Sequence, residues 1–193
     1  MIKIIHRINS IKKLKKIDNN HGIEIDVRSF NKNLILNHDP FKNGDLLKNW
    51  IKFYNHKLLI VNIKEEGLEY QILKILNKYK IKNYFFLDQT FPFLVKFSHR
   101  MKKNCAFRLS DYESISTIKK IKDKIKWVWI DFFENFYFNK KDFEFLKKNK
   151  LKICLVSPEL KNLSSKNIRI MKDIIKKNNI KVDAICTKKP NLW

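Results

Sequence analysis

Residues 22–41 read GIEIDVRSFNKNLILNHDPF, a pattern that predicts one strand, a turn and a second, shorter strand. In the first strand apolar residues alternate with Glu24, Asp26 and Arg28, and side chains two apart on a strand share a face. Two carboxylates and a guanidinium are therefore expected on one side of this strand, and the hairpin ends near His38. Adjacent carboxylates repel each other unless a cation lies between them, so this face is a candidate functional site.

Similar runs of β-branched and aromatic residues recur along the chain, separated by longer segments whose apolar residues recur at intervals of three and four. The eight predicted strands are Ile2–Arg7, Gly22–Val27, Leu58–Lys64, Tyr84–Asp88, Cys105–Ser110, Trp127–Phe133, Lys152–Ser157 and Val182–Thr187. The clearest predicted helices cover residues 44–54, 68–79, 140–148 and 164–177.

Strands that are hydrophobic along their length and alternate with helices indicate a parallel sheet covered by helices. Eight is the number of strands that closes a barrel. We therefore expect an α/β fold, a compact (β/α)8 TIM barrel without large insertions, with residues 1–193 forming a single domain.

The composition narrows the classes of protein to consider. No apolar run approaches the roughly 18 residues of a membrane span, and the N-terminus lacks a signal-peptide pattern, so we expect a soluble, cytoplasmic protein without a membrane span. Cys105, Cys154 and Cys186 each lie in an apolar run and are expected to be buried thiols. The aromatic stretch 127–138 is expected to pack in the core, with a substrate-side wall or an oligomer contact as alternatives.

The net charge of +23 would ordinarily suggest a nucleic acid or an anionic surface as partner. Most of the basic residues are lysines, however, and they are spread along nearly every predicted helix instead of being concentrated in one segment. This distribution favours a solvated exterior. Nucleic-acid binding stays an unfavoured alternative, since no motif supports it, and it predicts steeply salt-dependent binding to nonspecific DNA.

Polar residues gather where the predicted strands end, at the edge where the active sites of (β/α)8 barrels form. They are His6 and Arg7, Glu24 and Asp26, Asn62 and Lys64, Asp88, Arg108 and Ser110, Asp131, Ser157, and Thr187. Charged groups are costly to bury unless they are paired or bind a metal, so such a set indicates a site.

The carboxylates of Glu24 and Asp26 have the hard oxygen ligands that Mg²⁺ or Ca²⁺ prefers. Salt bridges to Arg28 or Lys64 are the alternative explanation for the same pair. His6 and His38 are expected beside the carboxylates and supply two candidate groups for proton transfer.

The ordered motif His6-Arg7, Glu24-x-Asp26 and His38-Asp39 resembles the signature of the glycerophosphodiester phosphodiesterases. These are TIM-barrel members of the phospholipase-C-like phosphodiesterase superfamily. Lys64 matches the Lys of the family's third-strand Glu-x-Lys motif, and residues 185–190, ICTKKP, resemble its closing segment.

The resemblance implies hydrolysis of a small phosphodiester, a glycerophosphodiester or a related polyol or sugar phosphodiester, with Mg²⁺ or Ca²⁺ as cofactor. It also implies roles for individual residues. These are general acid and base for His6 and His38, phosphate binding for Arg7 and Lys64, and metal binding for Glu24 and Asp26 with Asn62 as a weak third ligand. Asp88, Arg108 and Asp131 are possible accessory residues at the same mouth.

The sequence departs from the family pattern at two positions. Ile8 follows the His-Arg pair where the family usually has Gly, and Asn62 replaces the third-strand Glu. An Asn still offers a carbonyl oxygen, but it removes one negative charge from the cation's shell, so the metal should bind more weakly. This substitution motivates a second hypothesis, a catalytically degenerate barrel that binds a phosphorylated ligand without turnover.

Overall fold

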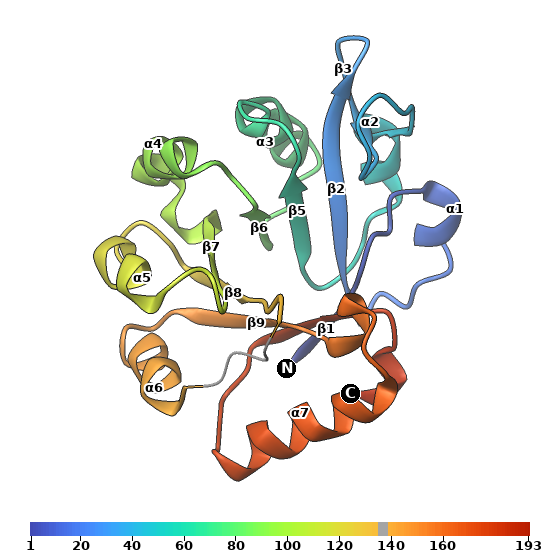
Figure 1. The fold of residues 1–193 in the computed structure, drawn as a ribbon. Helices are drawn as coiled ribbons and strands as arrows, with labels where there is room; N and C mark the ends of the chain where they lie inside the picture. Colours follow the sequence, from blue (N-terminus) through green and yellow to red (C-terminus); the bar gives the residue numbers. More distant parts are fainter. Residues whose placement is uncertain (135–138) are drawn as a thin grey trace.

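The computed structural model of the chain describes residues 1–134 and 139–193 and has the expected (β/α)8 architecture. Strands radiate around a common centre and helices form an outer ring (Figure 1). The eight strands of the barrel are β1 (Ile2–Ile5), β2 (Gly22–Phe30), β5 (Leu59–Ile63), β6 (Tyr84–Leu87), β7 (Ala106–Leu109), β8 (Trp127–Ile130), β9 (Lys152–Val156) and β10 (Ala184–Thr187). Each predicted strand is present, and the prediction of a barrel is confirmed.

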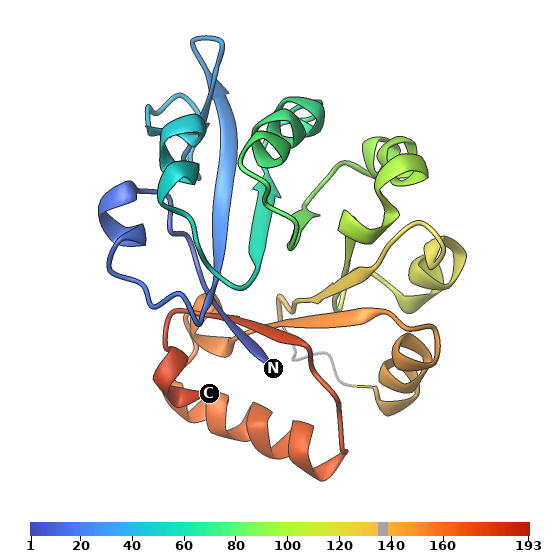
Figure 2. The ribbon, with the colours of Figure 1, turned by 180° about the vertical axis from the view of Figure 1, so that it is seen from behind.

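Parallel pairing runs from β6 through β5, β2, β1, β10, β9 and β8 to β7. The first and last strands meet through Ile2–Ile5, which pair with Ala184–Thr187. Between β6 and β7 the pairing is reduced to one isolated bridge, Phe86 with Cys105, so the ladder is interrupted there. The gap between these two strands is visible from behind in Figure 2.

The predicted hairpin is confirmed, and it projects beyond the barrel. Strand β3 (Asn33–Leu36) pairs antiparallel with β2 through a turn whose central residues, Asn31 and Lys32, have φ angles of 46° and 62°. Two successive left-handed residues give the type of turn that matches the twist of a two-stranded hairpin.

The helices follow the strands in alternation. They are α1 (Ile11–Leu14), α2 (Leu47–Trp50), α3 (Glu69–Lys78), α4 (Phe91–Met101), α5 (Ile115–Ile121), α6 (Lys140–Lys148) and α7 (Ser165–Lys177). Short 3-10 turns complete the chain, namely η1 (Ile51–Phe53), η2 (Lys102–Asn104), η3 (Pro158–Lys161) and η4 (Pro190–Leu192). None of the helices among the described residues is long and apolar enough to cross a membrane.

The helix predicted over 44–54 begins later than expected. Asp45 and Leu46 instead form strand β4, which pairs with β3, and the Asp45 carboxylate accepts a hydrogen bond from the backbone N–H of Ile11 at 2.6 Å. These contacts with distant segments hold the first residues of the predicted helix in an extended conformation. Only the remainder forms α2 and η1.

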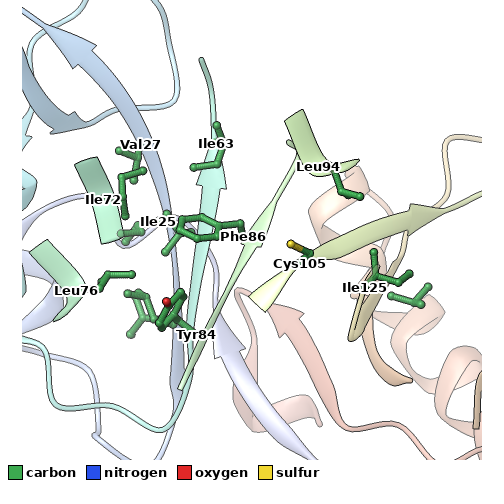
Figure 3. Close-up of a cluster of buried hydrophobic side chains, with 14 of the residues drawn as sticks. Ile25, Val27, Ile63, Ile72, Leu76, Tyr84, Phe86, Leu94, Cys105 and Ile125 are labelled. Carbon is green, nitrogen blue, oxygen red and sulfur yellow. The ribbon is translucent and has the colours of Figure 1, made fainter. Parts of the chain in front are cut away.

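Two layers of apolar side chains surround the sheet. The outer layer lies between strands and helices, where Ile25 and Phe86 from the strands and Leu76 from α3 lie together (Figure 3). The inner layer fills the barrel, and in it the rings of Phe85 and Trp127 stack with centroids 4.6 Å apart.

The three cysteines are free and buried, as predicted. Cys154 and Cys186 belong to the inner layer, and Cys105 to the outer one. The aromatic stretch 127–138 begins in β8 with Trp127 and Trp129 in the barrel core, and its last four residues, 135–138, lie outside the described residues.

Candidate active site

A cavity of about 390 Å³ opens at the carboxyl ends of the strands. Eight of the ten predicted site residues line it: His6, Arg7, Glu24, Asn62, Lys64, Asp88, Arg108 and Asp131. They come from six strands and the loops that follow them. Most of the polar edge expected from the sequence therefore lines one cavity, and the apolar inner layer fills the barrel.

Glu24 lies on the lumen side of β2 and is only 1% exposed. One of its oxygens, Oε2, accepts a hydrogen bond from the backbone N–H of Arg7 at 2.8 Å. Arg7 adopts a left-handed conformation, with φ at 55°, that is uncommon for a residue with a side chain. Burial, together with the charge of Asp26, raises the pKa of Glu24.

Asp26, two residues further along β2, is fully buried and lies among cationic groups. Lys64 Nζ lies 3.2 Å from Oδ1, and Arg7 Nε lies 3.8 Å from Oδ2. The side-chain amide of Asn9 donates to Oδ2 at 2.8 Å. The salt bridge to Lys64 considered from the sequence is thus present, whereas Arg28 pairs with Glu65 at 3.5 Å.

The oxygens on β2 and β5 fit a hard cation in type and position. Asp26 and Asn62 are register partners on these neighbouring strands. Glu24 Oε1, Asp26 Oδ1 and Asn62 Oδ1 are all buried without a hydrogen-bond partner among the described residues, and Asp26 Oδ1 has only its ion pair with Lys64. Unsatisfied buried oxygens are costly, and a bound Mg²⁺ or Ca²⁺ would satisfy them.

The donor set is nevertheless poor in charge. Within residues 1–134 and 139–193, no group of three or more His, Cys, Asp or Glu side chains is arranged to hold a metal ion. Asn62 would have to contribute the third protein oxygen. A cation held this way meets two carboxylates, one of which is already paired with Lys64.

His6 follows β1 and faces Glu24, with Nε2 lying 3.9 Å from Oε2. Its side chain is mostly buried, and burial together with the charges of Arg7 and Lys188 lowers the pKa of His6 to about 3. The imidazole is therefore neutral near pH 7, so a ring nitrogen is free to accept a proton.

His38 is one of the two predicted site residues that do not line the cavity; buried Asp26 is the other. His38 lies on the loop between β3 and β4, and its side chain is 41% exposed. Its Nδ1 lies 3.0 Å from Asp39 Oδ1, and its backbone oxygen accepts from Arg28 Nε at 3.1 Å. His38 is nevertheless near the end of β2, since the backbone N–H of the preceding residue, Asn37, donates to the oxygen of Asp26 at 3.1 Å. Its role as the partner of His6 stays a prediction.

A network of ion pairs forms the opposite wall of the cavity. Arg108 contacts Asp88 and lies 3.5 Å from Asp131 and 3.8 Å from Glu113. Asp131 also pairs with Lys161 at 2.9 Å. The three accessory residues proposed from the sequence are therefore linked to one another through Arg108.

Several residues at the cavity were not among the predicted ones. Lys161, Lys188 and Trp129 line it, and Asn9 holds Asp26 through both its side-chain oxygen and nitrogen. Trp129 could have been found, because it precedes Asp131 by two residues and shares its face of β8. Asn9 and Lys188 lie on loops and Lys161 ends the 3-10 turn η3, and strand alternation gives no orientation in such segments.

Comparison with protein-family models finds no match, and no curated protein matches the chain either. Solved structures do match over nearly the whole length. A glycerophosphodiester phosphodiesterase from Agrobacterium tumefaciens str. C58 aligns with a TM-score of 0.66 and 12% identity, covering 100% of this chain and 99% of that one. A glycerophosphoryl diester phosphodiesterase from Parabacteroides distasonis gives a TM-score of 0.67 and 12% identity, covering 99% and 84%.

A third structure, of a protein assigned as a glycerophosphodiester phosphodiesterase from Galdieria sulphuraria, gives a TM-score of 0.72 and 16% identity, covering 99% of this chain and 95% of that one. At such low identities the likeness speaks for the arrangement of the backbone alone. The chain has the barrel fold of the glycerophosphodiester phosphodiesterase structures that it matches.

Proposed function

We propose that this protein hydrolyses a small phosphodiester, a glycerophosphodiester or a related polyol or sugar phosphodiester, with a divalent cation, Mg²⁺ or Ca²⁺. The observation that carries the proposal is the cavity at the carboxyl edge, where His6, Glu24 and Asn62 lie beside the cations Arg7 and Lys64. The fold shared with the matching phosphodiesterase structures supports it.

In this proposal Glu24, Asp26 and Asn62 would hold the cation, because each has a buried oxygen that accepts no hydrogen bond among the described residues, on the neighbouring strands β2 and β5. When bound, the cation supplies positive charge that offsets the negative charge of the phosphodiester. Arg7 and Lys64 bind phosphate oxygens and orient the ligand. Their pairing with Asp26 fixes their side chains before the ligand arrives.

Neutral His6 takes a proton from the hydroxyl group that attacks phosphorus. The bond between phosphorus and the leaving oxygen breaks, and that oxygen needs a proton to depart as an alcohol. His38 is the proposed donor of this proton, on the strength of the sequence motif. Attack by a hydroxyl of the ligand itself gives a cyclic phosphodiester and an alcohol, and attack of water on the cyclic ester then gives the phosphomonoester.

A second candidate function is binding of a phosphorylated ligand without turnover. Two observations favour it: Asn62 provides an uncharged oxygen where a carboxylate would bind a cation more strongly, and Lys64 lies 3.2 Å from Asp26 in the place where a cation would compete. On this reading the barrel keeps its phosphate-binding groups and lacks an effective metal site.

The experiment is hydrolysis of glycerophosphocholine, glycerophosphoethanolamine, glycerophosphoglycerol and bis-p-nitrophenyl phosphate with Mg²⁺, Ca²⁺ or EDTA. Wild type is compared with His6→Ala and His38→Ala, and with His99→Ala as control, since His99 is exposed near the end of α4. We expect turnover that needs the cation, disappears in the first two variants and persists in the control. Full activity in both His6→Ala and His38→Ala would refute the catalytic assignment. No turnover by folded wild type would favour the binding-only barrel.

A further inference from the structure

Glu159 connects the ends of two neighbouring strands at the mouth of the cavity. It lies on η3, directly after β9, and its carboxylate accepts three hydrogen bonds. The donors are the hydroxyl of Ser157, the hydroxyl of Thr187 at 2.5 Å and the backbone N–H of Lys188 at 2.9 Å. Burial opposes the ionisation of Glu159, but these hydrogen bonds lower its pKa, so it is a carboxylate at neutral pH.

The groups around Glu159 are themselves held in place. Ser157 is completely buried, its backbone N–H donates to the oxygen of Cys186 at 2.9 Å, and its hydroxyl accepts from Trp193 Nε1 at 2.8 Å. The junction between β9 and β10 is therefore ordered by side chains as well as by the sheet. We call Ser157, Glu159, Thr187 and Trp193 the β9–β10 bracket.

Lys188 is the residue that this bracket presents to the cavity. It follows Cys186 by two residues and so continues the lumen face of β10, and its exposed side chain lines the cavity. Its charge also contributes to lowering the pKa of His6, which indicates that the two side chains are close.

The other lining cations already have acidic partners. A carboxylate oxygen lies 3.8 Å from Arg7, 3.2 Å from Lys64, 3.5 Å from Arg108 and 2.9 Å from Lys161. Lys188 has no such partner within 4.0 Å among the described residues. Residues 135–138, Asn-Phe-Tyr-Phe, carry no acidic side chain in any case.

We propose that Lys188 binds a phosphate oxygen of the ligand and that Glu159 is the residue that positions it. The inference rests on the proposed function, because it takes a phosphoryl group as the ligand, and it adds a binding residue that the sequence motif does not contain. An ammonium group without a partner attracts an anion more strongly than one whose charge a carboxylate already offsets. Lys188 therefore contributes more to phosphate affinity than its exposed position suggests.

The test is the affinity for inorganic phosphate and for glycerol 3-phosphate, measured by titration calorimetry in EDTA on the full chain. Loss of a charged hydrogen bond weakens binding by about tenfold to a hundredfold, so we expect Lys188→Ala to raise the Kd by about tenfold or more. Lys188→Arg should restore most of the affinity. The matched control is Lys189→Ala, because Lys189 is also exposed, does not line the cavity and donates to Ser165 Oγ at 2.8 Å.

A positioning role for Glu159 predicts coupling to Lys188. Glu159→Gln keeps the size of the side chain but removes one acceptor from the bracket, so we expect weaker phosphate binding in the wild-type background. In the Lys188→Ala background the same change should have no further effect, whereas a general structural defect would weaken both. Equal and additive losses would refute positioning by Glu159.

Two outcomes overturn the proposal: unchanged phosphate affinity in Lys188→Ala, and no measurable phosphate binding by folded wild type. Failure of the catalytic proposal has a different signature, since binding is measured without turnover. If the protein hydrolyses no diester but binds phosphate in a way that depends on Lys188, the inference about Lys188 holds and the binding-only barrel is supported.

Discussion

Replacing Asn62 by Glu should make the barrel less stable without a divalent cation and more responsive to one. Asn62 is buried, is the register partner of Asp26 and has an amide oxygen without a hydrogen-bond partner. The substitution adds a third carboxylate beside Glu24 and Asp26. Three adjacent carboxylates repel one another when empty and provide a stronger site for Mg²⁺ or Ca²⁺ when a cation binds.

The expected changes are large enough to measure. A buried carboxylate without a partner should lower the free energy of unfolding by about 2–4 kcal/mol in EDTA, allowing for partial relief by protonation. For a chain of this size that corresponds to a fall in Tm of about 5–15 °C. A cation present at a hundred times its Kd raises the free energy of unfolding by about 2.7 kcal/mol, which corresponds to a rise in Tm of about 5–11 °C.

The assay is thermal unfolding followed by calorimetry in EDTA, Mg²⁺ or Ca²⁺ at constant ionic strength. Asn77→Glu is the control, because Asn77 is exposed on α3 and receives the same chemical change away from the cavity. The reasoning is refuted if the cation raises the Tm of Asn62→Glu no more than that of wild type. It is also refuted if the control responds equally, since the effect would then come from charge alone.

Three further substitutions test the fold and the electrostatics of the site. Gly22→Ala would place a Cβ against the side chain of Ile4 and 2.8 Å from the backbone oxygen of Leu58, so urea unfolding should show a loss of about 1–3 kcal/mol, and an unchanged midpoint would contradict the close packing. In the absence of divalent cations, unfolded His6 binds a proton below about pH 6.5 whereas the folded side chain has a pKa of about 3, so stability falls as the pH drops through this window. His6→Gln should reduce that slope by up to about 1.4 kcal/mol per pH unit, and an unaltered slope would argue against burial of a neutral imidazole. Trp50→Phe removes the hydrogen bond from Nε1 to the oxygen of Ile8 at 3.0 Å and should cost about 1–3 kcal/mol in the same assay, unless water replaces the donor.

The strands were predictable because their signal is local. The run Leu59–Ile63 is apolar except for Asn62 and rich in β-branched residues, which is typical of a strand buried on both faces. The start of α2 was not predictable in the same way. The conformation of Asp45 is determined by its hydrogen bond with the backbone N–H of Ile11 and by pairing with β3. Neither contact can be predicted from the residues next to Asp45 in the sequence.

The same distinction separates the site residues. Glu24, Asn62 and Asp131 were identified because alternation on a strand, or just beyond its end, determines which face a side chain occupies. His38 lies on a loop and Lys161 at the end of the 3-10 turn η3, where orientation depends on contacts between segments. The motif predicts a role for His38, whose backbone oxygen accepts from Arg28 and whose side chain does not line the cavity, and that role stays a prediction.

The scarcity of acidic residues makes their position at the cavity informative. The chain has 19 acidic and 42 basic residues, so an acidic side chain is the less common of the two kinds of charge. Glu24 and Asp26 are nevertheless buried there, at the cost of a raised pKa for Glu24. One exposed cation can be replaced by another with little effect. The buried carboxylate of Asp26 pairs with both Arg7 and Lys64, so no other side chain can take its place. We therefore expect the chemistry of this protein to depend on these buried acids and the cations paired with them, together with Lys188, whose ammonium group has no acidic partner within 4.0 Å among the described residues.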